Sequence, residues 1–220
     1  MIKIGIELNN VVRDINTQII KYYKKDIDKS FDDTNFNKNV LNVIDGLNFD
    51  EKKGKYNFLY IDYPYEIFGC AKPMHKNLSV MINNFLVNLG NIGESDSNVC
   101  FFSLKENALT IQSTYFFLSK IGSRIRRVIF PIIGEKLWNE YDVLITTNAN
   151  IVNNKPKDKK VVLIKKDDNT DLIDKCDLVY DSLFDLLSDE EFLFKLNNVK
   201  SSNNNFLTKI SNKIKKIFRQ

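Results

Sequence analysis

The chain opens with a short apolar run that ends in polar residues, and a second apolar pattern follows at once. The run covers residues 2–6 and the polar loop residues 7–10, after which apolar residues recur at intervals of three and four over residues 11–23. The short run is typical of a buried strand, and the spacing of three and four predicts an amphipathic helix. A strand, a polar loop and a helix in this order form the opening half of a βαβ unit.

From residue 98 onward, apolar runs of strand length alternate with helical patterns. This alternation favours a parallel sheet covered by helices on both faces. We therefore predict an α/β fold with a Rossmann-like parallel sheet, in which ligands bind at the carboxyl ends of the strands. The predicted strands cover residues 99–103, 127–131, 142–147, 160–165 and 177–180, and the predicted helices cover residues 106–120 and begin again near residue 182.

Residues 24–97 interrupt this alternation and are interpreted as an inserted, mostly helical cap. They are largely polar, with a short helix expected in the apolar patch at residues 40–47. Residues 57–63 are rich in aromatic side chains and are predicted as a strand, a helix is expected to start near residue 65, and residues 76–89 show an amphipathic helical pattern. The predicted domains are a core of residues 1–23 and 98–199, the cap of residues 24–97, and a linker and tail helix in residues 200–220.

The last fifteen residues form a basic amphipathic pattern behind a polar linker. A helix with a stripe of large apolar side chains needs a surface to cover that stripe. It can fold back on the core, dock in a groove of a partner protein, lie on an anionic membrane or touch nucleic acid. Among the external partners we favour another protein, in a homo- or hetero-oligomer. The predicted partner-binding stripe consists of Phe206, Ile210, Ile214, Ile217 and Phe218.

Composition and charge exclude few classes of protein but point away from a nucleic-acid binder. The 220 residues are 43% hydrophobic, which is enough for one sizeable core. A net charge of +4 is mild, whereas dedicated nucleic-acid binders usually carry clustered Lys and Arg. Cys70, Cys100 and Cys176 lie far apart, so we predict neither a disulfide framework nor a zinc site, and we assign none of them as a nucleophile.

The order of strands and of the polar residues at their ends resembles the haloacid dehalogenase superfamily, in its small nucleotidase-like branch with an inserted cap. The resemblance covers residues 1–23 and 98–190. In that family the first strand ends in Asp-x-Asp, where the first Asp attacks phosphorus and the second is a general acid and base; here Glu7 and Asn9 stand at these positions. The family's second strand ends in Ser or Thr, matched by Ser103, and a Lys precedes its fourth strand, matched by Lys136.

The same resemblance implies that the chemistry has been lost. The family's fourth strand ends in an acidic pair that holds Mg²⁺, but here Thr146 and Thr147 follow the apolar run. Glu7 keeps a carboxylate with one more methylene, and a misplacement of about 1 Å can cost roughly 100-fold in rate. Asn9 has no proton that titrates near neutral pH, so it cannot serve as a general acid or base. Four departures together predict an inactive site, with no cofactor.

Two of the matched positions have a structural interpretation as well. Ser103 and Lys136 are candidates to bind an anion such as a nucleotide phosphate. The alternative, which we favour, is that Ser103 caps the following helix and that Lys136 is solvated.

The resulting hypothesis is a non-enzymatic structural or interaction protein on an inactive scaffold of the haloacid dehalogenase type. The preferred context is a larger assembly, such as the virion or tail of a phage. The alternatives are a phosphatase or 5′-nucleotidase acting on small phosphate esters, which would require Mg²⁺, and a regulatory module that binds a phosphate or nucleotide without hydrolysing it. We expect a soluble protein of a reducing compartment, the host cytoplasm or a virion, because no signal peptide or run of ~18 apolar residues is found.

Overall fold

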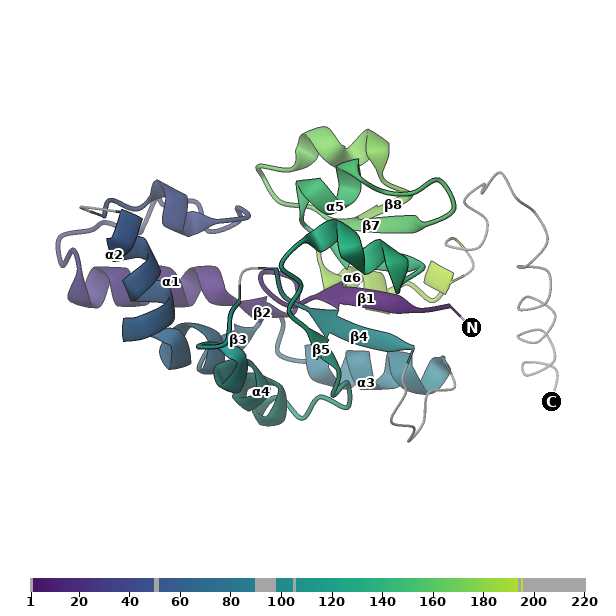
Figure 1. The fold of residues 1–220 in the computed structure, drawn as a ribbon, viewed down its shortest axis with the longest axis horizontal. Coiled ribbons are helices and arrows are strands. Elements are labelled where there is room, and N and C mark those ends of the chain that lie inside the picture. The colour runs from purple at the N-terminus through teal and green to yellow at the C-terminus, as the bar shows by residue number, and fades with distance from the viewer. Residues whose placement is uncertain (1, 50–51, 90–97, 105, 194, 196–220) are drawn as a thin grey trace.

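The core of the molecule is a six-stranded sheet in which every pair of neighbouring strands is parallel (Figure 1). The computed structural model describes residues 2–49, 52–89, 98–104, 106–193 and 195. This topology confirms the predicted α/β, Rossmann-like fold. In sheet order the strands are β5 (Val128–Ile129), β4 (Val99–Phe102), β1 (Ile4–Glu7), β6 (Val143–Thr146), β7 (Lys160–Ile164) and β8 (Leu178–Tyr180).

The central strands are apolar because both faces of the sheet are covered. On one face, Ile4 and Ile6 pack with α3 (Leu78–Asn88), α4 (Ile111–Lys120) and α6 (Leu183–Ser188). On the other face, Leu144 packs with η4 (Gly134–Asn139), α5 (Ala149–Asn153) and η5 (Thr170–Lys175). Parallel strands buried in this way read as continuous apolar runs, which is why the strands after residue 98 could be predicted.

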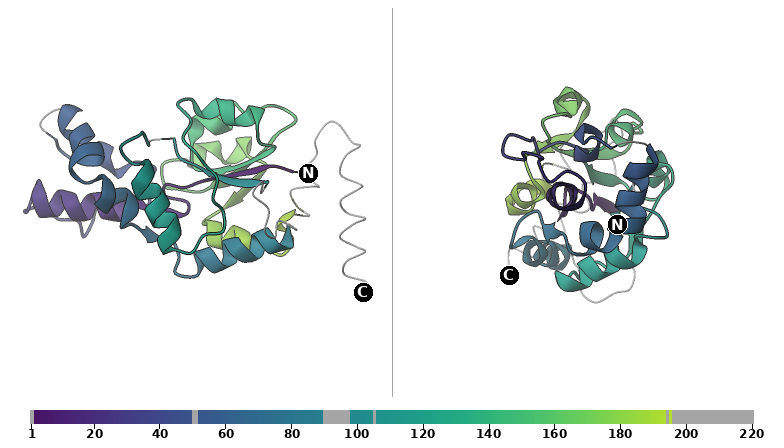
Figure 2. Two further views of the ribbon diagram at one scale, coloured as in Figure 1. Left: turned by 60° about the horizontal axis from the view of Figure 1, so that its bottom comes forward. Right: turned by 90° about the vertical axis from the view of Figure 1, so that its left-hand side faces the viewer.

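A short two-stranded antiparallel sheet stands at the base of the second part of the molecule. Its strands are β2 (Arg13–Asp14) and β3 (Lys72–Pro73), and residues 15–71 lie between them. These residues form a helical lobe at one end of the sheet, on the left in Figure 1 and visible again in Figure 2. The lobe contains α1 (Ile15–Asp26), η1 (Val43–Gly46), α2 (Lys52–Asn57), η2 (Phe58–Asp62) and η3 (Tyr65–Gly69), packed around their own hydrophobic cluster.

Three local predictions were wrong in detail. The first helix begins at Ile15, where the Asp14 side chain accepts a hydrogen bond from the Thr17 amide, and not at residue 11. In the segment 57–63, predicted as a strand, residues 57–62 are helical, because Phe58 and its aromatic neighbours pack inside the helical lobe and not against the sheet. The helix predicted from residue 106 begins at Ile111, after a loop.

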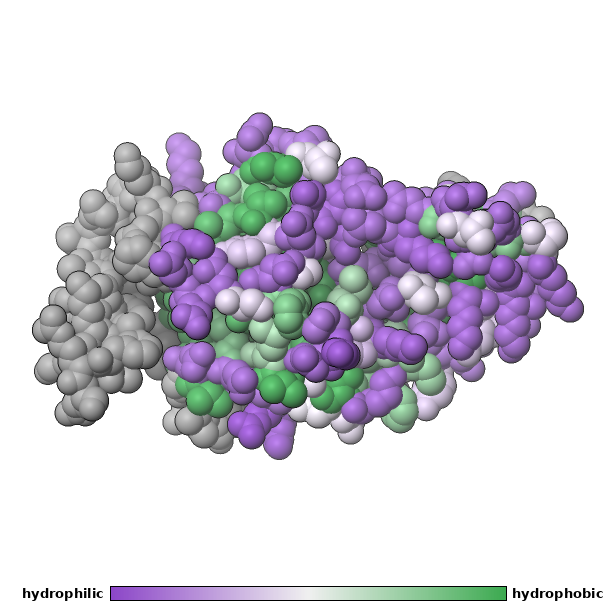
Figure 3. Space-filling model, turned by 180° about the vertical axis from the view of Figure 1, so that it is seen from behind, coloured by the Kyte–Doolittle hydropathy of each residue, from purple (hydrophilic) through white to green (hydrophobic). Residues whose placement is uncertain are grey.

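The packing groups two helices differently from the predicted domains. Helix α1 packs within the helical lobe, whereas α3 packs on the sheet, although residues 24–97 were predicted as one cap. The division of the chain into domains stays a prediction, and the tail stripe of residues 206–218 lies outside the described residues. None of the described helices is long and apolar enough to cross a membrane. Seen from behind, the molecule carries scattered apolar patches within a mainly hydrophilic surface (Figure 3).

Candidate functional site

Glu7 is the last residue of β1, and its carboxylate is held by the end of the neighbouring strand β6. The side chain is buried, and its Oε2 atom accepts hydrogen bonds from the Thr146 hydroxyl at 2.7 Å and from the Thr147 amide at 2.8 Å. The Thr147 hydroxyl donates a third, at 3.0 Å. Because parallel strands end at the same edge of the sheet, these three residues meet although 139 positions separate Glu7 from Thr146.

Asn9 lies two residues further on and is also buried. Its amide nitrogen donates to the Ser103 hydroxyl at 3.0 Å, which joins the ends of β1 and β4. Its carbonyl oxygen accepts two hydrogen bonds from Arg13, from Nε at 3.0 Å and from Nη2 at 2.6 Å. Ser103 therefore does not cap the following helix as we favoured; Thr110 occupies that N-cap position. Both polar atoms of the Asn9 side chain make hydrogen bonds within the protein.

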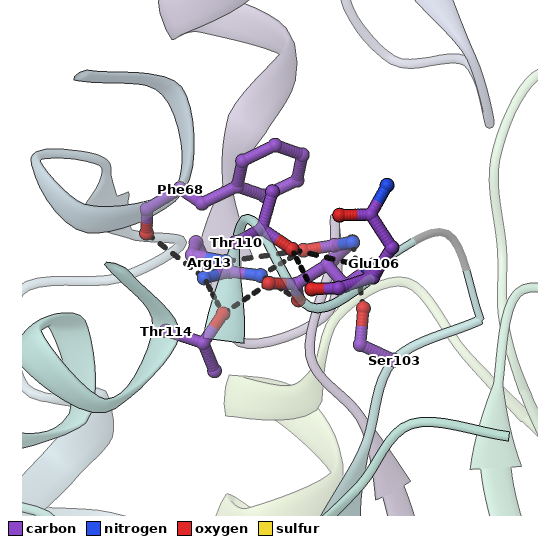
Figure 4. Close-up of polar contacts among 8 residues, drawn as sticks. Arg13, Phe68, Ser103, Glu106, Thr110 and Thr114 are labelled. Atoms are coloured by element: carbon purple, nitrogen blue, oxygen red, sulfur yellow. Dashed lines mark hydrogen bonds and ion pairs between the residues drawn. The ribbon is translucent and has the colours of Figure 1, made fainter. Parts of the chain in front are cut away.

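Arg13, which the sequence did not mark as a site residue, is the centre of this cluster (Figure 4). Its side chain is fully buried, and the rings of Phe68 and Phe117 lie 5.3 and 5.4 Å from the guanidinium carbon. Two donors go to Asn9, and Nη1 donates to the Phe68 carbonyl and to the Thr114 hydroxyl, both at 2.8 Å. The fifth goes to Glu106. All five guanidinium N–H donors are thus used.

Glu106 supplies the countercharge to Arg13. The two side chains are completely buried, with Arg13 Nη2 2.5 Å from Glu106 Oε1, and the Thr114 hydroxyl donates to the other carboxylate oxygen. Burial lowers the pKa of Arg13, while the adjacent Glu106 carboxylate acts in the opposite direction. A guanidinium remains charged in proteins, so the pair is a buried salt bridge. It connects β2 to the segment before α4.

Of the two lysines Lys136 and Lys166, it is Lys166 that is buried near the strand ends. Lys136 lies in η4 and is exposed to solvent, so the structure does not bring it into the buried cluster. Lys166 lies two residues after the end of β7, is only 4% exposed, and donates from Nζ to Asn39 Oδ1 at 3.3 Å. Burial lowers its pKa, and nearby carboxylates, among them Asp14 and Glu7, oppose this effect. Its place just after an apolar strand was the sequence signal that could have identified it.

The donor set around Glu7 does not fit a divalent cation. Mg²⁺ prefers several hard oxygen ligands, usually including carboxylates. Here the hydroxyls of Thr146 and Thr147 both donate to Oε2 of Glu7, so hydrogen-bond donors occupy one of the two carboxylate oxygens that a cation would use. Among the described residues, no group of three or more His, Cys, Asp and Glu side chains could hold a metal ion.

Comparison with known proteins adds a weak likeness to solved structures. No family model and no curated protein matches the sequence. The structure is similar to a crystal structure described as a haloacid dehalogenase-like hydrolase from Burkholderia xenovorans LB400. The match has 13% sequence identity and a TM-score of 0.45, and it covers 87% of this chain and 98% of the other. The fold class stated above accordingly rests on the observed sheet topology.

Proposed function

We propose that this protein is a non-enzymatic interaction module, built on a core that resembles the haloacid dehalogenase superfamily. The observation that carries the proposal is the contact set of Arg13. Its guanidinium is fully buried, uses all five donors and saturates the carbonyl oxygen of Asn9. The end of the sheet at which that family performs its chemistry is, in this chain, part of the packed interior.

The two residues at the family's catalytic positions support the same proposal. A carboxylate nucleophile needs a lone pair directed at the incoming phosphorus atom. Glu7 directs Oε2 at three donors of β6 and the residue that follows it. Asn9 has no group that titrates near neutral pH, and its amide is engaged with Ser103 and Arg13. Both side chains therefore stabilise the junction of strands rather than face a substrate.

We further propose that the module acts in an assembly, through its C-terminal segment. The support is the sequence stripe from Phe206 to Phe218, whose large apolar side chains can anchor a helix in a partner's groove. A phage virion or tail remains the assembly that we propose.

An activity assay and a ligand-binding assay test the non-enzymatic proposal. We expect the purified chain with Mg²⁺ to hydrolyse neither an aryl phosphate nor nucleoside monophosphates above the buffer rate. Millimolar Mg²⁺ should also leave the melting temperature unchanged, whereas a ligand at 100 times its Kd stabilises a fold by about 2.7 kcal/mol. Turnover that disappears in Glu7→Gln, with the circular dichroism spectrum preserved, would refute the proposal and establish the phosphatase.

One observation favours a second candidate, the binding of a phosphate or nucleotide without hydrolysis. Lys166 is a buried ammonium just after β7, and its backbone amide donates to Asn169, whose side chain donates to the Thr147 carbonyl. Titration calorimetry with inorganic phosphate and with nucleoside monophosphates distinguishes the candidates. Binding that is lost in Lys166→Met and retained in Lys136→Met would support this second function. A titration without heat of binding would exclude it and leave the interaction module as the proposed function.

A further inference from the structure

A short segment of the helical lobe lies across the sheet end and is held by hydrogen bonds along its whole length. This strap, residues 37–41, connects Phe36 to the turn before η1. Every one of its residues makes a hydrogen bond through its side chain or its backbone to groups outside the strap. An external hydrogen bond at every position is unusual for a loop, since loops generally leave their backbone to solvent.

One side of the strap is held by the turn that follows β7. The Asp167 carboxylate accepts hydrogen bonds from the side chains of Asn37 at 2.9 Å and Asn39 at 2.8 Å, and the Asp167 amide donates to the Asn39 carbonyl at 3.0 Å. The Asp168 carboxylate accepts from the Leu41 amide at 3.0 Å. From beneath, the buried Lys166 ammonium donates to the Asn39 side chain.

This receiving turn is itself fixed to the candidate site. Asn169 is 1% exposed and accepts a hydrogen bond from the Lys166 amide at 2.7 Å. Its side-chain nitrogen donates to the carbonyls of Ile164 and Thr147, both at 3.2 Å. Since Thr147 also holds Glu7, the strap is connected to the end of β1 through a continuous series of hydrogen bonds.

Two asparagines hold the other side of the strap. Asn16, in the first turn of α1, donates to the carbonyls of Lys38 at 3.0 Å and Val40 at 2.7 Å. Asn10 donates to the Leu41 carbonyl at 3.2 Å and to the Asn16 side chain at 3.0 Å. Asn10 has a φ of 60°, a left-handed conformation that asparagine tolerates better than most residues. Its place in the loop after β1 thus directs its side chain to the strap.

A second attachment secures the opposite end of the helical lobe. Arg13 donates to the Phe68 carbonyl, and Lys120 of α4 donates to the carbonyls of Gly69 at 2.9 Å and Ala71 at 2.8 Å. We propose that the strap at residues 37–41 is a lock: it fastens the helical lobe to the turn Lys166–Asp168, so that the lobe and sheet move as one body and Glu7 is sealed from solvent. This lock goes beyond the proposed function, because it concerns access to the site and not its chemistry.

Hydrogen exchange of the full-length chain tests the lock. We expect the Leu41 and Asp167 amides to exchange at least 100-fold more slowly than in an unstructured peptide. The variant Asp167→Ala with Asp168→Ala should accelerate exchange across the strap at least tenfold while β1 and β6 amides remain protected. The matched control is Asp171→Ala with Asp174→Ala, two exposed acids of the adjacent η5, which should change strap exchange less than twofold.

A thiol at the sheet end measures the seal itself. In a Thr147→Cys background, maleimide labelling of that residue, read by peptide mass spectrometry, should rise at least tenfold when Asp167 and Asp168 are replaced. The variant Asn37→Ala with Asn39→Ala removes the strap's own partners of Asp167 and should reproduce both effects. Agreement between the two variants excludes a folding defect of the first one as the cause. Strap amides that exchange at peptide rates in the unaltered chain would overturn the proposal. So would a strap that loosens while labelling at position 147 stays unchanged.

Discussion

The buried pair of Arg13 and Glu106 allows a quantitative test of the site's structural role. Arg13→Met keeps much of the side-chain volume but removes five donors. It leaves the Glu106 carboxylate without its countercharge, and the Asn9 and Phe68 oxygens without their donor. Removing one member of a buried ion pair typically costs about 3–5 kcal/mol. We therefore expect the free energy of unfolding to fall by about this amount, a large share of a typical domain stability of about 5–15 kcal/mol.

A double-mutant cycle separates the charge from the remaining contacts. Replacing both members, Arg13→Met with Glu106→Leu, removes the stranded carboxylate, and exchange of a buried pair for apolar groups is often nearly neutral. The double variant should be more stable than Arg13→Met alone by about 2 kcal/mol, the remaining loss coming from unpaired oxygens at about 1–3 kcal/mol each. A sum of the two single losses would mean that the residues act independently.

Urea unfolding supplies the measurement. The only tryptophan, Trp138, is buried in the sheet cluster, so its fluorescence and the circular dichroism signal report the same transition. The control is Arg127→Met. Arg127 forms an ion pair with Glu140 at 2.8 Å, and it is a suitable control because both side chains are more than half exposed. Such a pair contributes about 0–1 kcal/mol. The reasoning is refuted if Arg13→Met costs no more than Arg127→Met.

Three further predictions concern packing, pH and the tail. Gly5→Ala should destabilise the fold by about 1–3 kcal/mol in urea unfolding, because a Cβ there would lie 2.6 Å from Leu144 Cδ2. Gly54→Ala should instead stabilise it by about 0.5–1 kcal/mol in the same assay, because Gly54 lies in helix α2 and alanine favours a helix more than glycine does. Burial raises the pKa of Asp142, but hydrogen bonds from Lys159 and the Lys3 amide outweigh this and leave it below the usual 3.8. Its contribution is thus present above that value, and the stability deficit of Asp142→Asn should shrink as pH falls below 3.8 and the folded carboxylate is protonated; a deficit that is constant from pH 7 to 2 would contradict this. Truncation before Ser201 should leave the melting temperature within about 2 °C, yet abolish higher-order assembly measured by native mass with its partners; a loss of several kcal/mol would instead make the tail part of the core.

That polar residues would meet at the candidate site could be predicted, because their meeting depends on where strands end. Apolar runs identified each strand that the structure describes after residue 98 to within about two residues, and parallel neighbours must end at one edge. Glu7 and Thr146 therefore had to meet, as did Asn9 and Ser103. The content of the site could not be predicted in the same way. Arg13 fell within a pattern read as a helix, and its partner Glu106 is 93 positions away.

The sequence by itself determined the α/β class, the central position of residues 4–7 and the polar character of the strand ends, because these follow from local periodicity and burial. Only the tertiary structure decided which charges are paired, that Lys166 and not Lys136 is buried, and that the aromatic segment 58–62 is helical. Ion pairs and asparagine contacts join residues far apart in the chain, and their partners depend on how two separately packed clusters meet. Local sequence patterns do not encode how the two clusters pack against each other. The strap and the Arg13 cluster can therefore be recognised only in the folded molecule.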